Sequence, residues 1–153
     1  PVQSMSTLTT HDMPTLIGYW HCLDLELGKE IGLYPTEEIL QTLYADRHEN
    51  KQAILDTLHG HGSIDEHVGR DVNHTGMNRD LNCGMQVHMA GGSSALLSLQ
   101  LEDWLEMDKP VNIPGTSFEY PNWRRKLDMN TRELFDQPAN QKFCEAISRH
   151  RAY

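Results

Sequence analysis

The amino-acid sequence predicts a predominantly helical α/β fold that forms part of a larger parallel sheet structure. Its patterned segments follow the order strand, long helical stretch, strand, long loop and helix over 153 residues. Alternation of strand and helix is typical of βα units, whose strands pair in parallel. Two short strands do not form a stable sheet alone. We therefore expect these strands to require neighbours that the chain does not contain.

The N-terminal segment predicts a short strand followed by a helix. Residues Ser4–Thr10 alternate along the chain and have enough β-propensity for a strand. From Thr15 to Ile31, large apolar residues recur at the helical period. Gly28 and Gly32 are the positions where we expect this helix to break.

The clearest helix is predicted over Thr36–His59, where a capping hydroxyl precedes two glutamates that suit the helix dipole. Arg47 and Lys51 interrupt its apolar stripe, so we expect the middle of the helix to be solvated or bent. Residues 59–72, rich in Gly, His and Asp, predict a loop with a short helical piece. A further helix is expected over Asn78–Ala90.

The second half of the chain predicts another strand, a long loop and a final helix. Ser94–Leu101 is a short, mostly apolar run, which is typical of a strand buried on both faces. Residues 108–123 contain three prolines and one glycine. Irregular segments of this length are usually functional. The last helix is expected to begin at Gln137 or Pro138 and to end at Arg149.

Composition limits the function classes. A formal net charge of −9 argues against a nucleic-acid partner, because such proteins normally present a basic face. No apolar run is long enough to span a bilayer, and the start has no signal-peptide pattern. The three cysteines are widely spaced and form no CxxC pair, which favours a reducing, cytoplasmic compartment.

Polar residues follow both predicted strands. His11 and Asp12 come directly after the first strand, and Glu102, Asp103 and the proline-rich loop follow the second. In a (β/α)₈ barrel the active site is built just past the C-terminal ends of the strands. The alternative interpretation is that Asp12 only caps the next helix and that His11 is a surface residue.

The motifs "STLTTHD" and "NIPGTSFEYPNWRRKL" resemble those of the amylomaltases, the 4-α-glucanotransferases of glycoside hydrolase family 77 in the α-amylase clan. The resemblance extends over the whole chain, through "GYWHC", "GLYPTEE" and "LQLEDWL", and is closest to enzymes of the bacterial maltodextrin pathway. It implies that Ser4–Thr10 and Ser94–Leu101 are the seventh and eighth strands of a TIM barrel. Residues 1–153 would then be the C-terminal portion of the catalytic barrel and not a complete domain.

The resemblance also implies the roles of three residues in a retaining transfer of α-1,4-glucan segments between maltodextrins. Asp12 would be the auxiliary carboxylate that stabilises the transition state, and His11 and Asn112 would bind sugar hydroxyls. The nucleophile and the acid/base lie upstream in the family, so we expect the isolated chain to be inactive. No cofactor or metal is implied.

Other features have simpler interpretations. The histidines at 59, 61, 67 and 74 lack the fixed spacing of a zinc site. The basic run Arg124–Lys126 is interpreted as a clamp on the long loop. Trp20, Trp104 and Trp123 are interpreted as packing residues, with sugar-stacking platforms as the alternative. The competing hypothesis for the whole chain is an autonomous helical interaction module. In either case we expect apolar surface where other strands are missing, and self-association through it.

Overall fold

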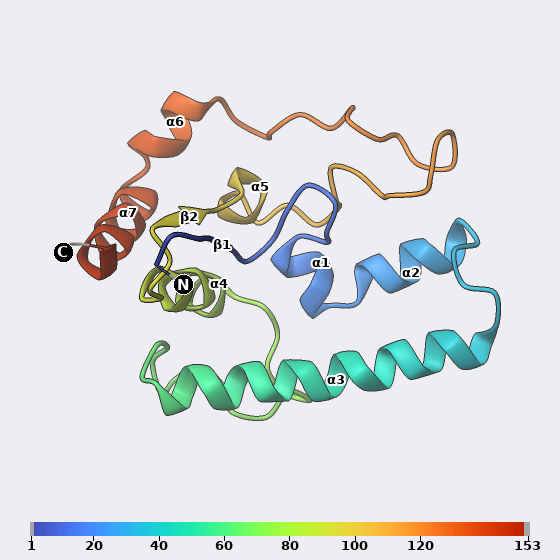
Figure 1. The fold of residues 1–153 in the computed structure, drawn as a ribbon, viewed down its shortest axis with the longest axis horizontal. Coiled ribbons are helices and arrows are strands. Elements are labelled where there is room, and N and C mark those ends of the chain that lie inside the picture. The colour runs from blue at the N-terminus through green and yellow to red at the C-terminus, as the bar shows by residue number, and fades with distance from the viewer. Residues whose placement is uncertain (1, 152–153) are drawn as a thin grey trace.

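The computed structural model describes residues 2–151, in which helices predominate over a two-stranded sheet. In chain order the elements are β1 (Met5–Thr7), α1 (Leu16–Trp20), α2 (Leu23–Glu30), α3 (Glu37–Gly60), α4 (Arg79–Ala90), β2 (Leu96–Ser98), α5 (Leu101–Trp104), α6 (Thr131–Asp136) and α7 (Pro138–Arg151). Figure 1 shows the strands near the centre, α3 along one side, and a long irregular segment leading to α6. Within the described residues, no helix combines the length and the apolar character needed to cross a membrane.

The two strands pair in parallel, as the strand–helix–strand order predicts. Met5 lies opposite Leu96, and Thr7 lies opposite Ser98. The predicted extents, residues 4–10 and 94–101, are too long, because each strand has three residues. Just past β1 the carbonyl of Thr9 accepts a hydrogen bond from the Thr7 hydroxyl at 2.6 Å. Such local hydrogen bonds between a side chain and the backbone compete with the pairing of strands.

The prediction that the second strand is buried on both faces is wrong for this chain. Leu96 is 63% exposed, and Met5 beside it in β1 is 62% exposed. The reason is the size of the sheet: among residues 2–151 each strand pairs with one neighbour. The sheet therefore presents apolar side chains to solvent.

The segment predicted as helical over Thr15–Ile31 is helical, but its break lies at Cys22 and not at Gly28, which lies inside α2. Cys22 adopts a left-handed conformation with φ of 59°, and this residue separates α1 from α2. The Thr15 hydroxyl caps α1 by accepting a hydrogen bond from the Gly18 amide at 3.1 Å. Gly18 is required for close packing, since a Cβ there would lie 2.9 Å from the carbonyl oxygen of Asp108.

Helix α3 confirms the strongest helix prediction, including its cap. The Thr36 hydroxyl accepts from the Ile39 amide at 3.4 Å. The expectation for Arg47 and Lys51 is wrong, because both side chains turn inward to α1 and α2. Arg47 donates two hydrogen bonds to the carboxylate of Asp24, at 2.8 and 2.7 Å, and lies 3.9 Å above the ring of Tyr19.

These two cations bind the C-terminal end of α1. Arg47 donates to the carbonyl of Tyr19 at 2.6 Å, and Lys51 donates to the carbonyl of Trp20 at 3.0 Å. The last carbonyls of a helix have no intrahelical partner and carry partial negative charge. The interruption of the apolar stripe is therefore a docking contact between α3 and α1.

Two apolar clusters hold the helices together. The first joins α1, α3, α4 and the segment between α3 and α4; its buried members are Leu16, Trp20, Leu55, Leu58, Val68, Val72, Leu81 and Met85. The second joins α5, α6 and α7 through Trp104, Leu134 and Phe143. Helix α4 confirms the prediction over residues 78–90, and α7 confirms the final helix. The short helices α5 and α6 were not predicted.

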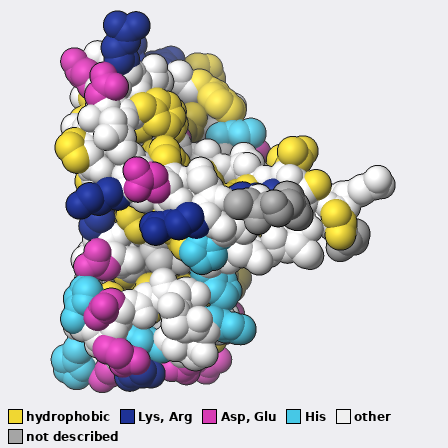
Figure 2. Space-filling model, turned by 90° about the vertical axis from the view of Figure 1, so that its left-hand side faces the viewer, with side chains coloured by type: hydrophobic (Ala, Val, Ile, Leu, Met, Phe, Trp, Pro, Cys, Tyr) yellow, Lys and Arg dark blue, Asp and Glu magenta, His cyan; other side chains and the backbone are white. Residues whose placement is uncertain are grey.

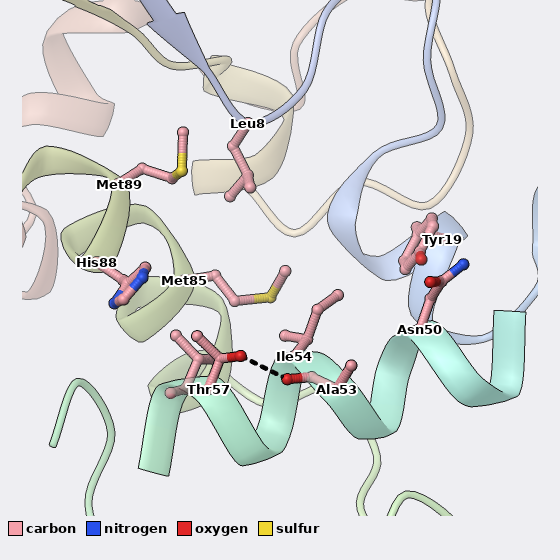
Figure 3. A pocket seen from close by; sticks show the side chains of 10 residues that line it. Leu8, Tyr19, Asn50, Ala53, Ile54, Thr57, Met85, His88 and Met89 are labelled. Carbon is pink, nitrogen blue, oxygen red and sulfur yellow. Dashed lines mark hydrogen bonds between the residues drawn. The ribbon is translucent and has the colours of Figure 1, made fainter. Parts of the chain in front are cut away.

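An apolar cavity of about 380 Å³ opens between α3 and α4. Figure 3 shows Ile54 and Met85 lining it from the two helices, with Leu8 above them just after β1. The hydrogen bond drawn there, from the Thr57 hydroxyl to the Ala53 carbonyl at 2.7 Å, lies within α3. The cavity extends the apolar surface that the described residues leave uncovered beside β1.

The segment between α3 and α4 contains turns and no helix over residues 61–78, so the predicted helical piece is absent there. Side-chain hydrogen bonds shape it instead: the carboxylate of Asp71 accepts from the Asn73 amide at 2.8 Å. The imidazole of His67 lies between Asp65 and Asp80, 2.8 Å from each. Figure 2 shows histidine and acidic side chains gathered at the end of the molecule that carries α3.

The exposed sheet generates a first prediction, for the isolated chain. We expect it to self-associate and to bind the apolar dye ANS, because Met5 and Leu96 sit on a strand pair that can accept further strands. Light scattering measures the association. Leu96→Lys should reduce it, whereas the same change at the fully exposed Phe118, in the long loop, should not. A compact monomer without dye binding would contradict this expectation.

A second prediction concerns His67, whose pKa is raised by hydrogen bonds to Asp80 and then to Asp65. The contacts of protonated His67 with the two carboxylates stabilise the folded state. Because they raise the folded-state pKa, this stabilisation is complete below the pKa of an unfolded histidine and is lost as pH rises through the folded value. An NMR titration of the imidazole should show the raised pKa. Asp80→Asn should lower it, while Asp71→Asn, whose carboxylate contacts His74 and not His67, should leave it unchanged.

Candidate functional site

The motif resemblance assigns roles to three residues, and these lie together in the structure: His11, Asp12 and Asn112. The side-chain amide of Asn112 donates to Asp12 Oδ1 at 2.7 Å. The Asn112 backbone amide donates to the His11 carbonyl at 3.1 Å. His11 Nε2 lies 3.3 Å from Asp12 Oδ2. Segments following the two strands thus converge past their C-terminal ends.

The segment that carries His11 and Asp12 is closed at its base by one buried side chain. The carboxylate of Asp103, in α5, accepts from the Thr9 hydroxyl at 2.5 Å and from the Leu16 amide at 2.7 Å. Burial raises the pKa of Asp103, and these two hydrogen bonds act in the opposite direction. The sequence places Asp103 after the second strand but gives no sign that it reaches the segment after the first.

The long loop that carries Asn112 is ordered by its own hydrogen bonds. The Asn122 side chain accepts from the Ile113 amide and donates to the Thr116 hydroxyl, each at 2.8 Å. The Tyr120 hydroxyl donates to the Pro110 carbonyl at 2.6 Å. These contacts fix the backbone on both sides of Asn112 although the loop has no regular secondary structure.

The clamp expected from Arg124–Lys126 is provided by Arg125. Its guanidinium lies 2.9 Å from a carboxylate oxygen of Asp108 and donates to the Lys109 carbonyl at 3.2 Å. Asp108 and Lys109 form the start of the loop, so Arg125 ties its two ends together.

The tryptophans divide into two groups. Trp20 and Trp104 are buried, as the packing interpretation predicts. Trp123 is 63% exposed and has a left-handed φ of 61°, so burial in a core is wrong for this residue, and the alternative of a sugar-stacking platform stays a prediction. Its ring lies over His11 with 5.0 Å between centroids. An exposed aromatic face is therefore part of the site, which the sequence alone did not distinguish from a core residue.

The polar groups border a cavity of about 150 Å³. Its lining includes the polar residues Asp12, Asn112, Asp24 and Tyr34, together with apolar residues of α2 and the long loop. Carboxylate oxygens accept hydrogen bonds, and an amide both donates and accepts. This combination beside an exposed aromatic ring suits a ligand rich in hydroxyl groups.

Metal chemistry has no support from the arrangement of side chains. Within residues 2–151, no three His, Cys, Asp or Glu side chains are grouped so that they could hold a metal ion. His67 and His74 lie beside carboxylates, and His61 contacts His88 at 5.3 Å between ring centroids. His59 Nε2 lies 3.2 Å from the carbonyl oxygen of Gly69. The three cysteines are unpaired thiols.

Comparisons with known proteins identify the family. Residues 1–131 match the sequence profile of glycoside hydrolase family 77, described as 4-alpha-glucanotransferase. The chain is 35% identical to the 4-alpha-glucanotransferase of Haemophilus influenzae over 151 residues, which are 99% of this chain and 22% of that protein. It is 30% identical to the 4-alpha-glucanotransferase of Mycobacterium tuberculosis over 125 residues, covering 80% of this chain and 16% of that protein.

A solved structure shares the fold. The amylomaltase of Corynebacterium glutamicum matches with a TM-score of 0.78 and 24% identity, over 94% of this chain and 21% of that one. The chain therefore spans about a fifth of the length of the relatives that it matches. The resemblance found in the sequence motifs is confirmed, and the chain belongs to the 4-alpha-glucanotransferase family, glycoside hydrolase family 77.

Proposed function

We propose that residues 1–153 are the C-terminal part of the catalytic (β/α)₈ barrel of a longer 4-α-glucanotransferase. Family membership, the partial coverage of the relatives and the parallel pairing of β1 with β2 support this proposal. In it, β1 and β2 are the seventh and eighth barrel strands. The remaining strands belong to the preceding part of the polypeptide and cover the exposed sheet.

The reaction is a retaining transfer of α-1,4-glucan segments between maltodextrins. A carboxylate nucleophile forms a bond to the anomeric carbon as the glycosidic bond breaks, and a carboxylic acid protonates the departing oxygen. The hydroxyl of an acceptor glucan then displaces the carboxylate, giving its proton to the group that acted as acid. Both of these carboxyl groups belong to the preceding part of the enzyme.

Asp12 supplies the third carboxylate, which binds hydroxyls of the reacting sugar and stabilises the oxocarbenium-like transition state. His11 and Asn112 bind hydroxyls of the same sugar. The observation that carries this assignment is the hydrogen bond between Asn112 and Asp12 at 2.7 Å, which joins the segments that follow the two strands. A carboxylate held in advance loses little of its stabilising effect to reorganisation.

Other properties of the longer enzyme follow from the chain's composition. Its ligand is a neutral glucan and not a nucleic acid, in keeping with the net charge of −9. Its compartment is the cytoplasm, where thiols such as those of the three unpaired cysteines stay reduced. The reaction needs no cofactor, because the carboxyl groups carry out each step.

The assignment of Asp12 is tested in the full-length enzyme. Asp12→Asn should lower kcat for maltotriose disproportionation by about 10³-fold or more while leaving folding intact, because its effect is on the transition state. His11→Ala should cost about 10²-fold, since one hydrogen bond among several is lost. Asn112→Ala should mainly raise KM. The control is Asp46→Asn, an exposed carboxylate on α3. Near-normal turnover by Asp12→Asn would refute the assignment.

The isolated chain tests whether the missing carboxyl groups are essential. Purified residues 1–153 incubated with maltotriose should yield no glucose or longer maltodextrins by chromatography, because the chain lacks the nucleophile and the acid/base. The same chain carrying Asp12→Ala, at matched purity, is the control. Product above that control would show that the chain performs the transfer unaided.

A further inference from the structure

Asp103 is the buried link between the two segments that flank His11 and Asp12. Its side chain belongs to α5, and the residue is 2% exposed. One carboxylate oxygen accepts from the hydroxyl of Thr9, and the other accepts from the amide of Leu16. These partners stand immediately before and after residues 10–15, so a single side chain closes the base of that segment.

Asp103 is itself held by a chain of buried polar groups. Its carbonyl accepts from the side-chain amide of Asn82 at 3.1 Å, and Asn82 Oδ1 accepts from Gln86 at 2.6 Å. Gln86 Oε1 in turn accepts from the indole of Trp104 at 3.1 Å. Each member has a partner, and fully satisfied buried networks specify one arrangement of the elements that they join. The network fixes α5 to α4.

A buried carboxylate lowers the stability of the folded state unless its hydrogen bonds offset the loss of solvation. Burial disfavours its charge, as the raised pKa of Asp103 shows, and an apolar residue of similar size would avoid that cost. What an apolar residue cannot do is accept two hydrogen bonds from groups on either side of one short segment. Thr9 is buried as well, so loss of the carboxylate would leave its hydroxyl and the Leu16 amide without partners.

We infer that Asp103 is a positioning residue for glucan transfer. It holds residues 10–15 so that the carboxylate of Asp12 lies at the correct position against the reacting sugar. This inference rests on the role proposed for Asp12. Asp103 is buried and acts through the Thr9 and Leu16 hydrogen bonds. A displacement of about 1 Å in a group that stabilises the transition state costs about 10²-fold in rate.

The test uses the full-length enzyme with maltotriose, measuring kcat, KM and Tm. Asp103→Ala should lower kcat about 10²-fold with little change in KM, because the interaction it supports is made in the transition state. Asp103→Asn should restore most of kcat, since its oxygen accepts from Leu16 and its amide donates to the Thr9 hydroxyl. Thr9→Val, which removes one of the two hydrogen bonds, should give an intermediate loss.

Asn140→Ala is the matched control for a purely structural loss. Asn140 is also buried, donates to the Leu134 carbonyl at 2.8 Å and accepts from Arg79, but it lies in α7. It should lower Tm while keeping kcat. A kcat for Asp103→Ala equal to that of Asn140→Ala would overturn the inference. If Asp103→Ala does not fold, a normal kcat for Thr9→Val would do the same.

The two proposals fail in different ways. If Asp12→Asn abolishes transfer and the Asp103 and Thr9 variants are normal, the positioning role is refuted and the proposed function stands. If Asp12→Asn keeps its turnover, the role of Asp12 is refuted and the positioning role falls with it.

Discussion

The carboxylate of Asp103 is the contact on which the arrangement of the surrounding elements depends. It joins the segment that follows β1, through Thr9, to the start of α1, through Leu16. The other end of α1 is bound by Arg47 and Lys51 of α3, which donate to its last carbonyls. Helix α1 is therefore fixed at both ends by charged side chains. The segment that carries Asp12 begins and ends on this fixed frame, although the side chains of His11 and Asp12 are themselves about half exposed.

The two-stranded sheet, in contrast to α1, is poorly covered by the rest of the described residues. Met5 and Leu96 are large apolar residues in a paired strand, yet more than half of each is exposed to solvent. A sheet of two strands buries little area, and burial of apolar area is the main favourable contribution to folding. The relatives are about five times as long as the region matched. In the proposed barrel, further strands would cover these apolar side chains.

The candidate site was predictable in part. His11, Asp12 and Asn112 were identified from the sequence motifs, and their proximity is what the structure adds. Asp103 was noted only as a polar residue after the second strand, and Trp123 was not distinguished from a packing residue. Asp103 acts on a segment almost a hundred residues away, and no local pattern shows such a contact. The exposure of Trp123 depends on how the long loop folds, because a tryptophan in a sequence indicates burial as readily as ligand contact.

The sequence by itself determined the elements whose cause is local. The helix after Thr36 and the helix after Asn78 each have a capping side chain and a periodic apolar face, and both occur as predicted. Parallel pairing followed from the order of strands and helices. The break at Cys22 and the inward turn of Arg47 were decided by the tertiary structure. Their cause is physical: a helix break or a buried cation is stable only when distant groups supply the packing and the hydrogen bonds that offset its cost.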